Sequence, residues 1–208
     1  MQPGESQRAR QGGQERSSSC LTAMAQAAVA ERLAPGMHAI DATVGNGHDT
    51  LFLARQVGAT GQVYGFDLQA CALAAASARL LAAGVADRVR LIHAGHETMA
   101  ERLPARLRGG VQAIMFNLGY LPGSDRQCIT RAVSSLQALR QALEWLAPGG
   151  LLTVLAYRGH AGGAEEADAV ARWLQGLEPS LYQVGQQYGD AARGTGPELG
   201  LVYRRPNR

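Results

Sequence analysis

The segment DATVGNGHDT, residues 41–50, decides the fold of this chain. Its glycines permit a tight turn and let a ligand approach the backbone closely. The apolar run MHAIDA (37–42) before it is typical of a buried strand, and LFLARQVG (51–58) after it has helical periodicity. A strand that passes through such a turn into a helix predicts the first unit of a Rossmann-like α/β sheet.

The same alternation of apolar runs and longer helical segments continues to the C-terminus. The further predicted strands are 62–67, 88–93, 111–117, 151–157, 180–188 and 199–205. The predicted helices are 20–33, 70–84, a segment near 98–108, 126–147 and 165–177. Strands that alternate with helices predict right-handed crossovers, hence a mostly parallel seven-stranded sheet with helices on both faces. The last two strands lack a helix between them, which predicts an antiparallel hairpin.

Composition indicates one domain. Residues 1–18 are polar and predict a disordered tail, because they cannot bury enough apolar surface to become ordered; the domain is expected over 19–208. No apolar run reaches membrane-spanning length, and nothing at the start suggests secretion. The three scattered cysteines favour neither a disulfide frame nor a zinc site, so we expect a cytoplasmic protein without a metal.

All 20 basic residues are arginine. The absence of lysine excludes Schiff-base lysine chemistry and a P-loop lysine. The formal net charge of +3 permits contact with RNA without requiring it. Charge alone therefore does not identify a partner.

Acidic residues stand at two successive strand ends and favour S-adenosylmethionine (SAM). Asp41 and Asp49 flank the glycine turn, an arrangement that repels pyrophosphate and suits the ammonium and sulfonium of SAM. Asp67 ends the second strand, where a carboxylate can accept both ribose hydroxyls of an adenosine. The dinucleotide pattern GxGxxG is missing from the turn. The candidate cofactor-binding residues here are Asp41, Thr43, Gly45, Asn46, Gly47, Asp49, Thr50, Asp67 and Gln69.

The third strand is followed by Gly95-His96-Glu97, where residues that contact adenine usually lie in this fold. His96 and Glu97 are therefore candidates for the rim of the cofactor site. Taken alone, His96 also fits a helix start or a packing position.

The fourth strand leads into Asn117-Leu-Gly-Tyr120, which matches the N-x-x-Y geometry of amine methyltransferases. A nitrogen nucleophile must point its lone pair at the methyl carbon, so its N–H groups need acceptors. The Asn117 side-chain oxygen can supply one, and Tyr120 a flat wall. Methyl transfer gains mostly from such orientation. A simple tight turn is the alternative interpretation of this segment. Covalent catalysis by cysteine is disfavoured, because no cysteine stands at a strand end.

The fifth strand ends in YRGHAGGAEE, residues 157–166. His160 could accept the proton that an attacking amine must lose, since its unperturbed pKa is about 6.5. Alternatively, His160 and Glu166 hold this loop together. Asn117, Tyr120 and His160 are the candidate catalytic residues. Asn117 is also a candidate cofactor-binding residue.

Several of these segments together resemble the small bacterial rRNA methylase-like methyltransferases. The likeness covers roughly residues 21–205 and rests on DATVGNGHDTLFLA, GQVYGFDLQ, the His96-Glu97 pair, FNLGYLPGSD and YRGHAGGAEE. Members of that family methylate the exocyclic amine of 5-aminomethyl-2-thiouridine at the tRNA wobble position. The resemblance thus implies a Rossmann-like class I SAM-dependent N-methyltransferase that acts on tRNA. By the resemblance, the residues that line the SAM site are Asp41, Gly45, Asn46, Asp67, Gln69 and His96, and those that face the amine are Asn117 and Tyr120.

Two segments depart from the family pattern: ITRAVSSLQAL (129–139) and GDAARGTGPEL (189–199). Both could lie near the tRNA, so alternatives remain open. They are a methyltransferase for rRNA or a small amine, a nicotinamide-dependent oxidoreductase, and an RNA-binding domain without catalysis. The sequence also leaves homodimerisation open.

Overall fold

The computed structural model describes residues 20–119, 130–189 and 196–207. Its strands are β1 (His38–Asp41), β2 (Gln62–Asp67), β3 (Val89–His93), β4 (Val111–Leu118), β5 (Leu146–Ala156), β6 (Tyr182–Tyr188) and β7 (Glu198–Arg204). They form one seven-stranded sheet in the order β3-β2-β1-β4-β5-β7-β6. All pairs are parallel except β5–β7 and β6–β7, so β7 runs opposite to the other strands of this sheet. The predicted sheet and its antiparallel final pair are confirmed.

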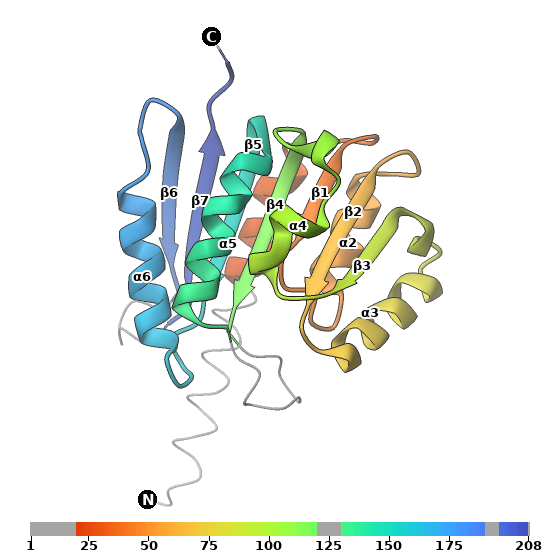
Figure 1. Cartoon of the computed structure of the whole chain (residues 1–208), viewed down its shortest axis with the longest axis horizontal. Helices are drawn as coiled ribbons and strands as arrows, with labels where there is room; N and C mark the ends of the chain where they lie inside the picture. Colours follow the sequence, from red (N-terminus) through yellow and green to blue (C-terminus); the bar gives the residue numbers. More distant parts are fainter. Residues whose placement is uncertain (1–19, 120–129, 190–195, 208) are drawn as a thin grey trace, which may run out of the picture.

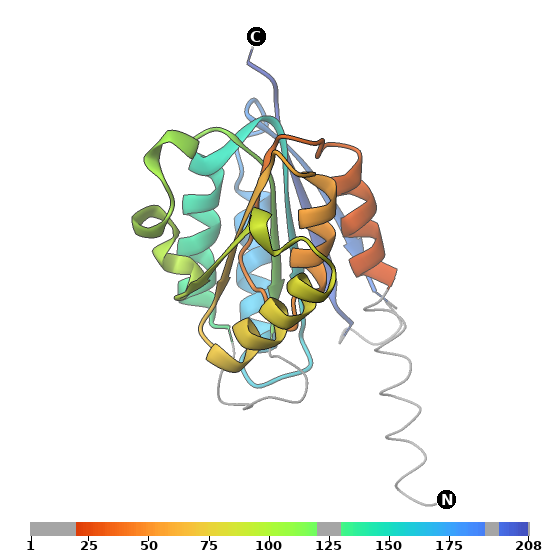
Figure 2. The ribbon, with the colours of Figure 1, turned by 90° about the vertical axis from the view of Figure 1, so that its right-hand side faces the viewer.

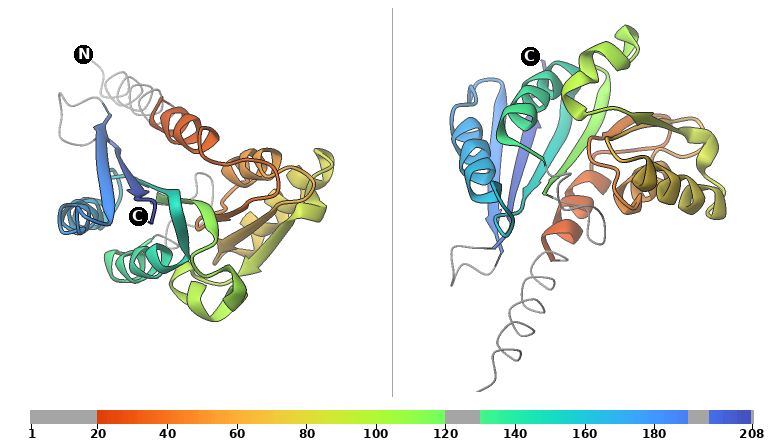
Figure 3. Two further views of the ribbon diagram at one scale, coloured as in Figure 1. Left: turned by 90° about the horizontal axis from the view of Figure 1, so that it is seen from above. Right: turned by 60° about the horizontal axis from the view of Figure 1, so that its bottom comes forward.

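Helices cover both faces of the sheet (Figures 1 to 3). On one face lie the helical residues 20–30, α2 (His48–Gln56) and α3 (Ala70–Ala82). On the other lie α4 (Met99–Arg102), α5 (Ala132–Trp145) and α6 (Gly163–Gln175). Three short 3-10 turns, η1 (Ala86–Arg88), η2 (His96–Thr98) and η3 (Ala105–Leu107), complete the described elements. Among the described residues no helix is long and apolar enough to cross a membrane.

Each face of the sheet has its own apolar core, because successive strand residues point to opposite sides. Ile40 and Phe116 pack with the residues of α5 and α6, whereas Ala39 and Met115 pack against the helices of the opposite face. Strands that are apolar at every position therefore bury both sides, as a doubly covered parallel sheet requires.

Three predicted elements differ from the structure. The segment 98–108 is not one helix, because Pro104 lacks an N–H and forces Leu103 into the extended region (φ −85°, ψ 145°). Helix α5 ends at Trp145, and β5 begins at once at Leu146, with a register shift before Leu151. Helix α2 begins at His48, earlier than predicted. The predicted tail 1–18 and residues 126–129 of the predicted helix lie outside the described residues.

The order of the strands locates the ligand crevice. β1 lies between β2 and β4, so the chain turns to one side of β1 for β2 and β3 and to the other for β4. In open α/β sheets ligands bind at the carboxyl ends of the strands where the topology changes direction. That edge lies at the bottom of Figure 1, where the arrowheads of β2 and β4 point.

Candidate active site

The loop after β1 is built around the carboxylate of Asp41, which is completely buried. Its Oδ2 accepts the hydroxyl of Thr50 at 2.6 Å, and its Oδ1 accepts the backbone N–H of Thr43 at 3.1 Å. Burial raises the pKa of Asp41 to about 7, and the charge of Asp49 adds to the increase. Donors from its own loop thus bind both oxygens of this buried carboxylate, and its contact with a cofactor ammonium remains a prediction.

The two glycines of the loop have left-handed backbone conformations, with φ 50° at Gly45 and 75° at Gly47. A Cβ on Gly47 would lie only 2.7 Å from the Cβ of Ala76. Gly47 is therefore required both for its turn and for the close approach of α3 to the start of α2.

Asp67 at the end of β2 holds the loop from the other side. Its Oδ2 accepts the N–H of Gly45 and its Oδ1 that of Gln69, each at 2.8 Å. Each carboxylate oxygen keeps a second lone pair, and the residue is only half-buried. Asp67 can therefore still accept hydroxyl groups, and its contact with a ribose remains a prediction.

Asn46 stands exposed at the apex of the loop, and its backbone oxygen accepts Arg79 Nε at 2.8 Å. Arg79 also lies 3.2 Å from Nε2 of His48 through its Nη2. The sequence did not single out Arg79, which lies in the last turn of the alanine-rich helix α3.

His96 lies beside the β1 loop, against Ala42, and Glu97 follows it in η2. Their place at the rim of the cofactor site remains a prediction. His96 is buried, its Nδ1 lies 3.2 Å from the carbonyl oxygen of Ala42, and its ring meets Phe116 edge-on. Because the carbonyl is an acceptor, Nδ1 carries the proton and Nε2 is an acceptor with no hydrogen-bond partner in the described part of the chain. Burial lowers the pKa of His96. The backbone oxygen of Glu97 accepts Gln141 Nε2 at 2.8 Å, which ties this segment to α5.

Asn117 near the end of β4 is tied to the β1 loop twice. Its backbone N–H donates to Thr43 Oγ1 at 2.7 Å, and its Nδ2 donates to Asp49 Oδ2 at 2.6 Å. A carboxylate can only accept, so the nitrogen of the amide must face Asp49. The Asn117 Oδ1 then has no partner among the described residues. Asp49, which is buried, accepts a second bond from Gln26 Nε2 at 2.6 Å.

The β4 tip continues through Gly119, where a Cβ would lie 3.3 Å from the ring of Tyr157 at the end of β5. The ring of Tyr157 therefore packs against the backbone at Gly119, two residues after Asn117. Tyr120 lies outside the described residues, so its predicted role as a wall remains a prediction.

Glu166 of α6 is 1% exposed and organises the neighbouring connection. Its oxygens accept the hydroxyls of Thr130 and Ser135, each at 2.6 Å. The backbone N–H of Thr130 in turn donates to Gly119 O at 3.0 Å. Glu166 thus ties α6 to the connection between β4 and α5, called the β4 loop below, and not to its own loop, residues 157–166, as the alternative interpretation expected.

His160 lies in the connection between β5 and α6. Its Nδ1 is 3.1 Å from the carbonyl oxygen of Ala161, so Nδ1 is a donor and Nε2 the basic nitrogen. The ring packs on Gly163, where a Cβ would come within 2.8 Å of Nε2. No described contact joins His160 to Asn117, and a role in proton transfer remains a prediction.

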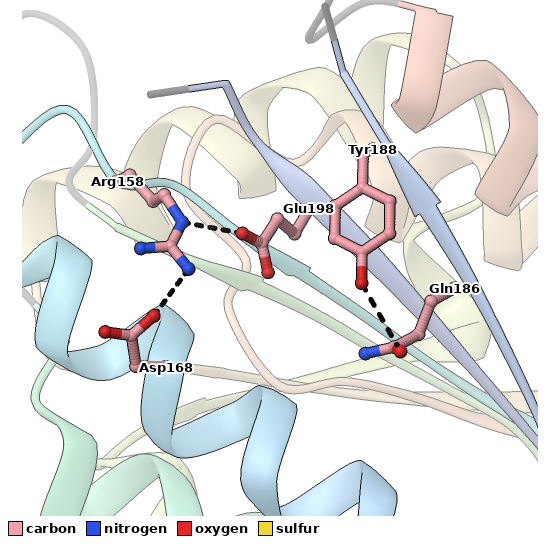
Figure 4. A network of polar contacts seen from close by, with 5 residues as sticks. All are labelled: Arg158, Asp168, Gln186, Tyr188 and Glu198. Carbon is pink, nitrogen blue, oxygen red and sulfur yellow. Dashed lines mark hydrogen bonds and ion pairs between the residues drawn. The ribbon is translucent and has the colours of Figure 1, made fainter. Parts of the chain in front are cut away.

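Arg158 bridges three elements at the same edge of the sheet (Figure 4). Its Nε donates to Glu198 of β7 and its Nη2 to Asp168 of α6, both at 2.6 Å. The hydrogen bond with Glu198, and then that with Asp168, raises the pKa of Arg158. Its charge is therefore paired within the fold and is not available to a phosphate.

The chemistry of this edge fits SAM. Carboxylates gather around a glycine loop, Asp67 keeps free lone pairs, and His96 has a buried acceptor without a partner among the described residues. No group of three or more metal-binding side chains occurs within the described ranges.

A family model described as "Putative rRNA methylase" matches residues 63–199, more than half of the chain. The chain belongs to the rRNA methylase family. Members with solved structures share its fold. A putative rRNA methylase from Clostridium thermocellum is 36% identical with a TM-score of 0.83, over 88% of this chain and 96% of that one.

Two further relatives are informative. A putative methyltransferase from Streptococcus mutans, in complex with SAH, is 31% identical with a TM-score of 0.78, over 88% of this chain and 97% of that one. The predicted Rossmann-like class I methyltransferase fold is thus confirmed. A protein of Arabidopsis thaliana named "tRNA (mnm(5)s(2)U34)-methyltransferase, chloroplastic" is 37% identical over 176 residues. The match covers 81% of this chain but only 63% of that relative.

Proposed function

We propose that this chain is a SAM-dependent N-methyltransferase that methylates the exocyclic amine of 5-aminomethyl-2-thiouridine at the wobble position of tRNA. The product is 5-methylaminomethyl-2-thiouridine. The observation that carries the proposal is the Asn117 amide, whose nitrogen is fixed on Asp49 while its oxygen has no partner among the described residues. The name of the Arabidopsis relative supports the choice of substrate.

When bound, SAM supplies an electrophilic methyl group on a sulfonium sulfur. The protein's part is to orient the amine, because methyl transfer gains mostly from alignment of the reacting atoms. Asn117 Oδ1 accepts one N–H of the neutral amine and thereby directs its lone pair into the crevice. The C–N bond forms as the C–S bond breaks, and the methylated amine releases one proton. We propose His160 Nε2 as its acceptor.

Cofactor residues follow from the geometry of the β1 loop. Asp67 would bind the ribose hydroxyls through its free lone pairs, and Gly45, Asn46 and Gly47 would offer their backbone to the ligand. Asp49 lies where an ammonium group would be attracted. Asp41 and Thr50 would act indirectly, through the shape of the loop.

Calorimetry tests the cofactor. SAM and its demethylated product are expected to bind, while NAD gives no heat. Binding of NAD in place of SAM would overturn the proposal and support an oxidoreductase.

Incubation with SAM and tRNA that carries 5-aminomethyl-2-thiouridine, followed by mass analysis of the nucleosides, tests the substrate. A mass increase of one methyl group on that nucleoside is expected. If rRNA or a free small amine were methylated while this tRNA stayed unchanged, the proposed tRNA substrate would be wrong and that molecule would take its place. A cytoplasmic site of action and homodimerisation remain predictions.

The Asn117→Ala variant tests the positioning of the amine. Without the acceptor the amine loses its orientation, so turnover is expected to fall by about 100-fold. Affinity for SAM should stay close to wild type, as measured by calorimetry on the same preparation. Full turnover in a variant that binds SAM normally would show that Asn117 does not orient the amine.

A further inference from the structure

Asp49 connects the helical residues 20–30 to the end of β4 through hydrogen bonds. It lies in the first turn of α2 and is 7% exposed. Its Oδ1 accepts Gln26 Nε2 and its Oδ2 accepts Asn117 Nδ2, both at 2.6 Å. Three residues that are distant in the sequence thus form one chain of hydrogen bonds, Gln26–Asp49–Asn117.

This chain determines how Asn117 presents its oxygen. The backbone of Asn117 is fixed by Thr43, but the amide plane is fixed only by the bond to Asp49 among the described contacts. The Asp49 carboxylate can rotate about its own torsion unless its second oxygen is also held. Among the described residues, Gln26 is the side chain that holds it.

Gln26 comes from a rigidly packed part of the protein. Leu21, Ala25 and Val29 of the same helical segment are buried in the apolar core of that face of the sheet. Figure 3 shows this segment beside α2. Gln26 is half-buried next to this apolar stripe, so its amide reaches Asp49 from a fixed position.

The repulsion between Asp49 and Asp41 makes the hydrogen bond from Gln26 to Asp49 more important. Asp49 lies near the buried Asp41, and the two carboxylates repel each other. Removal of the Gln26 amide would leave one oxygen of a buried carboxylate without its donor, and such a group rearranges or draws in water. Either change moves the amide of Asn117.

We infer that Gln26 is a positioning residue for methyl transfer, which acts through Asp49 to fix the acceptor oxygen of Asn117. This inference rests on the proposed function. It adds to the residues that support methyl transfer one that lies before β1, outside the sheet and its crossover helices. The residue touches neither the cofactor nor the substrate in this account.

The Gln26→Ala variant, with Met24→Ala as the matched control, tests the inference. Met24 has a side chain of similar length on the same helical segment but is 39% exposed. At saturating SAM and tRNA, kcat of Gln26→Ala should fall about tenfold, since small misplacements near a reacting group have effects of this size. The control should keep the wild-type kcat. The melting temperature should change little in both.

A double variant shows whether the effect passes through Asn117. If it does, Gln26→Ala combined with Asn117→Ala should be no slower than Asn117→Ala alone, because contacting groups in one chain are not additive. Multiplied losses would overturn the inference.

The Gln26→Glu variant adds a pH readout. A carboxylate at this position would oppose Asp49, with Asp41 the further acid that faces Asp49 from β1. Only a protonated Glu could donate as Gln does, so the ratio of variant to wild-type kcat should rise as pH falls from about 9 to about 6. A ratio that does not vary with pH would contradict the assigned hydrogen bond.

The outcomes separate the two proposals. A wild-type protein that binds SAM but gives no turnover on this tRNA overturns the proposed function and this inference together. An active wild type together with a Gln26→Ala variant at full kcat overturns the inference alone.

Discussion

Two buried carboxylates, Asp41 and Glu166, hold the two halves of the candidate site, and they do so differently. Asp41 is 0% exposed and takes its donors from its own loop, Thr43 and Thr50. Glu166 is 1% exposed and takes them from Thr130 and Ser135, which lie on other segments. The buried acid of the β1 loop is therefore held by local contacts, whereas that at the base of the β4 loop is held by tertiary contacts.

The two carboxylates also differ in their surroundings. Besides burial, the charges of Asp49 and Asp67 raise the pKa of Asp41. Glu166 instead accepts two neutral hydroxyls. The β1 loop thus concentrates negative charge that a cationic ligand would relieve, while Glu166 serves to connect segments.

The Glu166→Ala variant should give the largest effect, because it separates the two halves. It leaves the hydroxyls of Thr130 and Ser135 without their acceptor and creates a cavity. The expected loss is about 4 kcal/mol in the free energy of unfolding, measured with urea at neutral pH.

Glu165→Ala is the matched control for this variant. Glu165 lies in the same turn of α6 but is exposed, so its loss should change stability by less than about 0.5 kcal/mol. Equal stabilities of the two variants would show that Glu166 does not hold the β4 loop.

The Gly47→Ala variant should have the next largest effect and tests the other half. The new methyl group would meet the Cβ and the backbone Cα of Ala76 at 2.7 and 2.8 Å, and φ is 75°. Overpacking and the left-handed conformation together should cost about 3 kcal/mol of unfolding free energy.

Gly84→Ala separates these two contributions. Gly84 also has a positive φ of 66°, but nothing in the described structure lies within 4 Å of a Cβ there. It should lose only about 1 kcal/mol, the cost of the conformation. If both variants lost the same unfolding free energy in urea, the close approach of α3 would contribute nothing to the loss in Gly47→Ala.

This contrast between local and tertiary structure also explains what the sequence could predict. The turn of residues 41–50 carries its own acids, glycines and threonines, so the sheet, the loop and the position of Asp67 could be predicted from short stretches of sequence. Asn117 could be placed because it lies one residue before the end of β4. The burial of Asp41 could not be predicted, because an acid at the end of a strand is compatible with either a ligand contact or a turn.

Contacts across distant segments could not be predicted. Gln26 lies in an alanine-rich helical stretch, where one polar residue among apolar ones gives no indication of its partner. Thr130 and Ser135 do not differ in the sequence from other residues near the start of a helix, so their bonds to Glu166 could not be predicted. The broken segment 98–108 is different, because Pro104 is visible in the sequence and its effect on Leu103 could have been predicted.

The smallest effect is expected for Asp41→Asn, and it depends on pH. The ordinary pKa of the carboxyl is 3.8 and that in the folded protein about 7, so the folded state holds the proton more tightly. The contribution of Asp41 to stability is therefore fully present below about pH 4 and is lost as pH rises through 7. Between about pH 5 and about pH 8 the wild type should lose about 2 kcal/mol more than Asp41→Asn, which cannot ionise.

Urea unfolding of both proteins at about pH 5 and about pH 8 measures this difference. Carboxyl groups far from Asp41 contribute equally to the two profiles, so their contributions cancel. Asp87→Asn serves as the control, because this side chain is 72% exposed and its removal should leave the pH profile parallel to wild type. A profile of Asp41→Asn that is also parallel to wild type would mean that Asp41 is ionised at no cost. The β1 loop would then resemble the Glu166 region, with a buried acid that connects segments without storing repulsion.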